Sequence, residues 1–199
     1  MNDNAPRPLS PLVVLHGYSS GPGSAAGLAD AVDPHQERHH LCPAGPSEVS
    51  GGHAWFDPSL VGRPGVLGAA VRTVSATLAA AGEVVAGNRP VVIGWSQGGA
   101  AVLGALGHPT TPRVSALVLA GAFVADDPDH EFDPSALAGV PVLSLHGTDD
   151  EVVPVEFADD LVTLLSAAGV AVQTWRGPAG HGLPADAVAA ITAFLGEVG

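Results

Sequence analysis

The sequence predicts an α/β domain whose central sheet is mostly parallel and flanked by helices. Short, nearly continuous apolar runs alternate along the chain with longer alanine-rich segments. Such runs are typical of strands buried on both faces of a parallel sheet, and their alternation with helical segments is typical of doubly wound domains. The chain has 199 residues, 46% of them hydrophobic, which is enough to bury a sizeable core. We therefore expect residues 1–199 to form one compact domain.

The apolar runs are the expected strands. The four strongest are, in chain order, Pro11–His16, Pro90–Trp95, Val114–Leu119 and Val140–His146. Val170–Trp175 is a further expected strand, and His39–Cys42 has a weaker strand pattern.

Four other segments have helical patterns: Pro64–Ala86, Gln97–Leu106, Pro154–Ala168 and Pro184–Val198. The third has the clearest end signals, because it begins with proline, carries acidic residues in its first turns and stops before Gly169. In open α/β sheets, ligands bind beyond the carboxyl ends of the strands. We therefore expect the chemistry to lie in the loops that follow the strands.

Charge and cysteine content exclude several classes of protein. Seven basic against twenty acidic residues give a net charge of −13, which leaves too few Lys and Arg side chains to bind nucleic acid or an anionic membrane. The sequence has no run of about 18 apolar residues, the length that would be needed to span a membrane. Cys42 is the only cysteine, and the N-terminal segment lacks the apolar core of a signal peptide. We expect a soluble, cytoplasmic protein.

A candidate nucleophile follows the strand Pro90–Trp95. The sequence Gly94-Trp95-Ser96-Gln97-Gly98-Gly99 is a G-x-S-x-G motif between a buried strand and a helix. A tight strand-to-helix turn lifts the serine hydroxyl above the sheet, and glycines at both ends let neighbouring backbone pass closely. This context favours a nucleophilic Ser96 over an ordinary helix cap.

An acid and a base follow in the order that such a hydrolase requires, serine, then acid, then histidine. Asp149 and Asp150 lie in the loop that follows the strand Val140–His146, and His181 lies after the last expected strand between two glycines. Either aspartate could instead cap the helix that begins near Pro154. His146 precedes the acid and lies at a strand end, which favours bracing of the loop over a role as base.

An oxyanion hole would need two backbone N–H groups aimed at the reacting carbonyl oxygen. The N–H of Gln97, directly after the nucleophile, is one candidate. The second should come from the loop after the first strand, His16-Gly17-Tyr18-Ser19, where Tyr18 is the first choice and Ser19 the alternative. An ordinary glycine-rich turn is the other interpretation of this loop.

These residues together resemble the α/β-hydrolase superfamily, and within it the phospholipase/carboxylesterase family, which includes the acyl-protein thioesterases. The motifs that carry the resemblance are Leu15-His16-Gly17, Trp55-Phe56-Asp57, Gly94–Gly99, His146–Asp150 with Val152-Val153-Pro154, and Gly180-His181. The resemblance implies Asp150 rather than Asp149 as the triad acid, and Tyr18 and Gln97 as oxyanion donors. The chain is short for the family, so we expect a compact α/β-hydrolase fold without a large lid.

Three features stay open at this stage. Trp55 and Phe56 could line a substrate pocket or only fix a loop, and Trp95, beside the nucleophile, is a further pocket candidate. The acidic segment 122–138 could form a rim of the site or a solvated connection. His35, His39 and His40 lack the H-E-x-x-H spacing, which favours solvated loop histidines over a metal site.

The expected function is that of a serine hydrolase. A Ser96-Asp150-His181 triad would cleave carboxylic esters of short to medium acyl chains through an acyl-enzyme, with no metal or cofactor. The expected partner is a small-molecule ester, and the chain could be a monomer or a homodimer. A thioesterase or lactone hydrolase with the same triad is one alternative. A non-catalytic binding module of the same fold is another.

Overall fold

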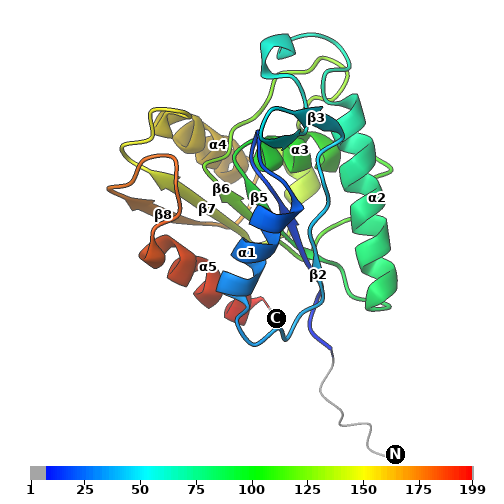
Figure 1. Cartoon of the computed structure of the whole chain (residues 1–199), viewed down its shortest axis with the longest axis vertical. Helices are drawn as coiled ribbons and strands as arrows, with labels where there is room; N and C mark the ends of the chain where they lie inside the picture. The colour runs from blue at the N-terminus through cyan, green and yellow to red at the C-terminus, as the bar shows by residue number, and fades with distance from the viewer. Residues whose placement is uncertain (1–7, 199) are drawn as a thin grey trace, which may run out of the picture.

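A six-stranded sheet forms the centre of the molecule in the computed structural model, which describes residues 8–198 (Figure 1). The strand order is β2-β1-β5-β6-β7-β8, and every neighbouring pair is parallel. The strands are β1 (Leu12–Leu15), β2 (His40–Leu41), β5 (Val91–Trp95), β6 (Ala116–Ala120), β7 (Val142–Gly147) and β8 (Val172–Gly177). The predicted mostly parallel sheet is confirmed.

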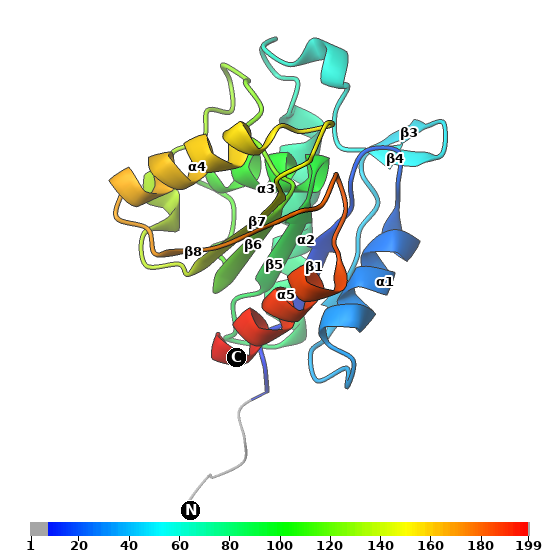
Figure 2. The same cartoon turned by 90° about the vertical axis from the view of Figure 1, so that its left-hand side faces the viewer.

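The helices cover both faces of this sheet, as Figures 1 and 2 show. They are α1 (Pro22–Val32), α2 (Gly68–Val84), α3 (Gln97–Leu106), α4 (Val155–Ala167) and α5 (Ala185–Glu197). Helices α1 and α5 pack on one face, whereas α2, α3 and α4 pack on the other. The α/β-hydrolase fold expected from the motifs is therefore present.

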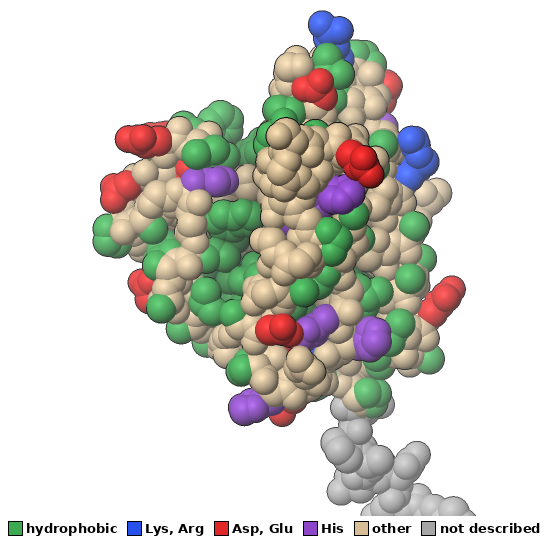
Figure 3. Space-filling view, in the orientation of Figure 1, with side chains coloured by type: hydrophobic (Ala, Val, Ile, Leu, Met, Phe, Trp, Pro, Cys, Tyr) green, Lys and Arg blue, Asp and Glu red, His purple; other side chains and the backbone are tan. Residues whose placement is uncertain are grey.

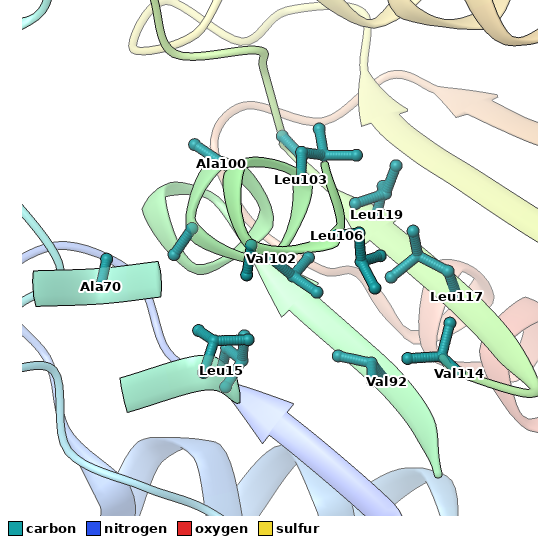
Figure 4. Packing of buried hydrophobic residues seen from close by; sticks show 14 of the residues in the cluster. Leu15, Ala70, Val92, Ala100, Val102, Leu103, Leu106, Val114, Leu117 and Leu119 are labelled. Carbon is teal, nitrogen blue, oxygen red and sulfur yellow. The ribbon is translucent and has the colours of Figure 1, made fainter. Parts of the chain in front are cut away.

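Alternate strand residues supply the two halves of the core, because successive side chains of a strand point to opposite faces. Val92, Leu117 and Leu119 pack with α3 on one face, while Val91, Ile93 and Val118 face α1 and α5. Figure 4 shows Leu103 and Leu106 of α3 beside Leu117 and Leu119. All of these side chains are buried, which explains why the strands appear in the sequence as continuous apolar runs.

The order of the strands places a topological switch point between β1 and β5. The chain moves outward from β1 to β2, returns to β5 beside β1, and then builds the rest of the sheet in the opposite direction. Ligands of open α/β sheets bind in the crevice that such a switch opens at the carboxyl ends of the strands. Gly17 follows β1 and Ser96 follows β5, so both lie at this crevice.

Five short elements were absent from the sequence prediction. Helix α1 lies between β1 and β2, and a small antiparallel hairpin is formed by β3 (Ser47–Val49) and β4 (Gly52–Ala54). The other two are short 3-10 helices, η1 (Pro58–Leu60) and η2 (Pro134–Leu137). The helix expected from Pro64 begins only at Gly68, because the residues before it form turns.

Asp127 holds two of the loops above the sheet together. Its buried carboxylate accepts hydrogen bonds from the N–H groups of Gly65 and Leu67, both at 2.8 Å, and of Asp129 at 3.0 Å. His130 Nδ1 lies 3.1 Å from the same carboxylate. The acidic segment 122–138 is therefore tied to the loop before α2 rather than being only a solvated connection.

We expect Asp127→Asn to weaken the fold and to flatten its acid sensitivity. Burial alone would raise the pKa of Asp127, but the hydrogen bonds from Leu67, Asp129, Gly65 and His130 outweigh it and lower the pKa. A carboxylate with a lowered folded-state pKa contributes stability that is complete above its ordinary pKa of about 3.9 and is lost as the pH falls through the folded value. Urea unfolding at neutral pH should show a loss of about 2–3 kcal/mol.

The same unfolding measured at several acidic pH values gives the second readout. Below about pH 4 the stability of the wild type should fall more steeply than that of Asp127→Asn, because the variant has lost one of the carboxylates with a lowered pKa. Asp160→Asn is a control for the charge change, since Asp160 is exposed on α4. Equal losses in the two variants would contradict the anchoring role of Asp127.

Candidate active site

Ser96 occupies a sharp turn between β5 and α3. Its backbone has φ +51° and ψ −118°, a conformation that non-glycine residues rarely adopt. The turn is possible because glycines surround it: a Cβ on Gly94 would lie 2.6 Å from Gly99 Cα, and one on Gly98 would collide with the carbonyl oxygen of Leu15. Strained residues of this kind cluster at active sites, and this one presents its hydroxyl at the switch point.

Ser96, His181 and Asp150 form a continuous hydrogen-bonded chain. His181 Nε2 lies 2.9 Å from Ser96 Oγ, and His181 Nδ1 lies 2.7 Å from Asp150 Oδ2. With its proton on Nδ1, the imidazole donates to the carboxylate and accepts from the serine hydroxyl. Three residues from distant parts of the sequence thus meet in the arrangement of a nucleophile, a base and an orienting acid.

Asp150 is buried and fully occupied by hydrogen bonds. Its Oδ1 accepts from the N–H groups of Val152 and Val153, each at 2.9 Å. Burial alone would raise the pKa of Asp150, but the bonds from His181, Val153 and Val152 outweigh it, so that the pKa lies below its usual range. The carboxylate is therefore ionised at neutral pH and can stabilise a positive charge on His181.

Asp149 points elsewhere. It is exposed, and its backbone N–H donates to the carbonyl of Ala179 at 3.0 Å. Helix α4 begins after Pro154 with no side-chain cap, so neither aspartate has the capping role that the sequence left open. Of the two, the structure brings Asp150 to His181.

The loop that carries His181 lies along the loop after β7. Thr148 N donates to the carbonyl of Gly177 at 2.8 Å. This bond and the one from Asp149 N to the Ala179 carbonyl join the two loops. Gly147 allows this approach, because a Cβ there would lie 2.6 Å from the carbonyl oxygen of Gly180. These contacts bring Asp150 and His181 together although 31 positions separate them.

The candidate oxyanion donors lie at the ends of β1 and β5. Gly17 is packed closely there, because a Cβ on it would lie 2.7 Å from Trp95 Cδ1 and 3.5 Å from Ser96 Cβ. In the described residues 8–198, neither the Tyr18 nor the Gln97 N–H donates to a backbone carbonyl in a turn, loop or cap. The role of these two N–H groups as oxyanion donors stays a prediction. The Ser19 side chain donates to the Ser50 carbonyl at 2.6 Å.

The side chain of Gln97 has a structural role that sequence analysis missed. Its Oε1 accepts from Trp55 N, and its Nε2 donates to the Phe56 carbonyl, both at 2.8 Å. The indole N–H of Trp55 donates to the His16 carbonyl at 2.8 Å. This network fixes the first residue of α3 to the loops on both sides of it.

The three aromatic pocket candidates fall into two groups. Trp55 is fully buried and Phe56 is 3% exposed, and both belong to the core cluster beneath α2 and α3. Of the two roles left open for them, their burial and hydrogen bonds favour fixing a loop. Trp95 is only partly buried, and its ring centroid lies 5.1 Å from that of His181. It therefore borders the candidate site.

Three other histidines, His146, His16 and His40, make local contacts. His146 Nε2 donates to the Val153 carbonyl at 2.7 Å and lies 3.3 Å from Asp150 Oδ2, which braces the acid loop. His16 Nε2 accepts from Gly45 N at 2.9 Å, and burial lowers the pKa of His16. His40 lies 2.8 Å from Asp33.

The profile of the family described as Phospholipase/Carboxylesterase matches residues 4–198. The chain belongs to the phospholipase/carboxylesterase family. The resemblance seen in the motifs is thereby confirmed, and the protein is an esterase-type hydrolase. Among the helices of residues 8–198, none is both long enough and apolar enough to cross a membrane.

Solved structures show the same fold over almost the whole chain. A carboxylesterase from Mesorhizobium loti has 25% identity, with 93% of this chain and 87% of that chain covered and a TM-score of 0.77. The Bacillus cereus carboxylesterase has 22% identity, 97% and 90% coverage and a TM-score of 0.79. SOBER1 of Arabidopsis thaliana has 21% identity, 94% and 97% coverage and a TM-score of 0.74. No significant sequence match was found among curated proteins.

Proposed function

We propose that this member of the phospholipase/carboxylesterase family hydrolyses small carboxylic esters through an acyl-enzyme on Ser96. The observation that carries the proposal is the hydrogen-bonded chain from Ser96 through His181 to Asp150, with Ser96 on a strained turn. Asp150 acts as the orienting acid and His181 as the base. Tyr18 and Gln97 supply the backbone donors of the oxyanion hole.

Acylation begins with attack of Ser96 Oγ on the ester carbonyl carbon. His181 Nε2 takes the hydroxyl proton as the Oγ–C bond forms, and the negative charge moves to the carbonyl oxygen. The N–H groups of Tyr18 and Gln97 stabilise that oxygen, and losing one such donor typically costs about 3 kcal/mol of barrier. The C–O bond to the alcohol then breaks, and the alcohol leaves with the proton from His181.

Deacylation repeats the sequence with water. His181 takes a proton from water as its oxygen bonds to the acyl carbon, and the same oxyanion forms again. Collapse of this intermediate breaks the bond to Ser96 Oγ, which recovers the proton from His181. Asp150 stays ionised throughout and stabilises the imidazolium in both steps.

Exposed apolar side chains at the end of the sheet that carries the triad support an apolar acyl group in the substrate. Val61, Val124, Val152 and Phe157 are exposed, and they lie in or next to the loops at the carboxyl ends of the strands. The loops of Val61 and Val124 are joined by a bond from Gly62 N to the Asp126 carbonyl at 2.8 Å. Exposed apolar side chains around a catalytic centre are typical of binding surfaces for apolar groups. We propose short to medium acyl chains as substrates.

Labelling with a fluorophosphonate tests the proposal directly, because the probe reacts only with an activated serine. We expect one adduct, found on Ser96 by mass spectrometry of the digested protein. His181→Ala should suppress labelling, whereas His108→Ala, at a partly buried position after α3, should leave it intact. Rates on an aryl ester, a thioester and a lactone with the same acyl group would then rank the leaving groups.

Absence of an adduct on folded protein would overturn the proposal. Folding should be verified by circular dichroism on the same sample. That result would favour the binding module of the same fold as the function, because the triad geometry would then be present without an activated hydroxyl.

A further inference from the structure

A hydrophobic pocket lies beside the proposed catalytic centre on the face of the sheet covered by α1 and α5. Its volume is about 160 Å³, and its apolar walls include Val14 of β1, Ala25 and Leu28 of α1, Trp95, and Leu183 before α5. We call this cavity the α1 pocket. Figure 3 shows the surface hollowed between α1 and the segment before α5, with hydrophobic side chains inside the hollow.

The walls of the α1 pocket come from the same segments that carry the catalytic groups. Trp95 directly precedes Ser96, and its ring packs against that of His181. Leu183 follows His181 by two positions, and His16, also in the wall, directly precedes Gly17. The pocket therefore adjoins the proposed catalytic centre through the Trp95 ring, which contacts both.

The position of His181 decides which half of an ester would lie on this side. The departing alcohol oxygen must come within hydrogen-bond reach of His181 Nε2, because that nitrogen returns the proton. The alcohol part is thus directed toward the segment of His181 and Leu183. The exposed apolar residues Val124 and Val152 follow β6 and β7, whose loops continue to the α3 and α4 side of the sheet. We therefore place the acyl group on the α3 and α4 side of the sheet.

We propose that the α1 pocket binds the alcohol part of the substrate and selects esters of compact, uncharged alcohols with a six-carbon ring or a chain of similar size. The inference rests on the proposed function. A cavity of about 150 Å³ lined by apolar side chains accepts benzene, so the α1 pocket matches a phenyl group. In the reaction, the bond between the acyl carbon and the alcohol oxygen breaks, the alcohol takes the proton from His181 Nε2, and it departs from this pocket.

The α1 pocket predicts a selectivity that two isomeric esters can measure. Benzyl acetate carries its ring on the alcohol side, and methyl phenylacetate carries it on the acyl side. Leu28→Trp fills the pocket from α1, where Leu28 is only partly buried. The ratio of kcat/KM for benzyl acetate to that for methyl phenylacetate should fall about tenfold or more, as is typical when a hydrophobic pocket rejects a group.

The test includes a matched control and two further variants. Leu164→Trp makes the same exchange on α4, at an exposed position on the opposite face, and should leave the ratio unchanged. Leu28→Ala enlarges the pocket and should raise kcat/KM for 1-naphthylmethyl acetate relative to benzyl acetate. If Leu28→Trp fails to fold, as judged by its melting temperature, Ser24→Phe obstructs the pocket from an exposed position.

The outcomes separate this inference from the proposed function. A ratio that rises in Leu28→Trp would mean that the pocket holds the acyl group, and an unchanged ratio would mean that the substrate does not use it. Either result overturns the inference while leaving the esterase intact. If wild-type protein hydrolyses neither ester and Ser96 takes no phosphonate, the proposed function fails and the inference falls with it.

Discussion

Replacing Ser96 by alanine should lower kcat/KM for ester hydrolysis by about 10⁴- to 10⁶-fold, the range found when a triad nucleophile is removed. The reason is that only Ser96 Oγ is within hydrogen-bond reach of His181 Nε2 in the described part of the chain. The loss should appear in kcat, because the acyl-enzyme can no longer form. Steady-state rates on a p-nitrophenyl ester measure this loss. The purified variant must be free of contaminating wild-type enzyme.

The control for this variant is a serine that has no catalytic contact. Ser166→Ala changes an exposed residue of α4 and should retain wild-type turnover. The fold of Ser96→Ala should survive, since alanine occupies less space and the backbone turn is set by the surrounding glycines. Residual activity above about 1% of wild type in a folded variant is incompatible with covalent catalysis by Ser96.

The sheet was predictable because its strands are buried on both faces. Residues such as Val92 and Ile93 point to opposite sides, and both sides are covered by helices, so each strand appears as an unbroken apolar run. Helix α3 was predicted with its observed bounds, Gln97–Leu106. Its sequence lies between a buried strand and a turn, which leaves little freedom in where it begins.

Helix α1 escaped prediction because its buried side is made of small residues. Ala25, Ala29 and Val32 face the core, and glycines at positions 23 and 27 interrupt the segment. Both features weaken the apolar periodicity on which a sequence prediction depends. The β3–β4 hairpin was missed for a related reason, since each of its strands has three residues and largely polar or small side chains.

The candidate triad could be inferred from sequence because each of its members follows a strand. Motifs at the ends of parallel strands meet at one edge of the sheet, so order and context were sufficient to nominate Ser96, His181 and an acid at position 149 or 150, and the family resemblance then favoured Asp150. The side chains of Gln97 and Asp127 could not be assigned in this way. Their partners lie 41 and 60 positions away, in loops whose approach depends on the complete fold.

Asp150→Asn should lower kcat by about 10⁴-fold at neutral pH, close to the effect of removing the charge of the acid in other triads. The amide can still accept hydrogen bonds from Val152 and Val153 through its oxygen, as Asp150 Oδ1 does now. Its NH₂ group would then face His181 Nδ1, which favours the imidazole tautomer that has its proton on Nε2. That tautomer cannot accept the Ser96 proton, so the loss should persist when the pH is raised.

Asp149→Asn is the matched control, because it removes the same charge one position earlier in the chain. Asp149 is exposed and has no contact with His181, so its variant should keep turnover within about threefold of wild type, as expected for a screened surface charge. Comparing both variants on one ester, together with their urea unfolding, separates catalysis from folding. A larger loss in Asp149→Asn would reverse the assignment of the acid. Equal losses would mean that the loop acts through its net charge. The hydrogen bond between Asp150 and His181 would then not be the cause of the loss in Asp150→Asn.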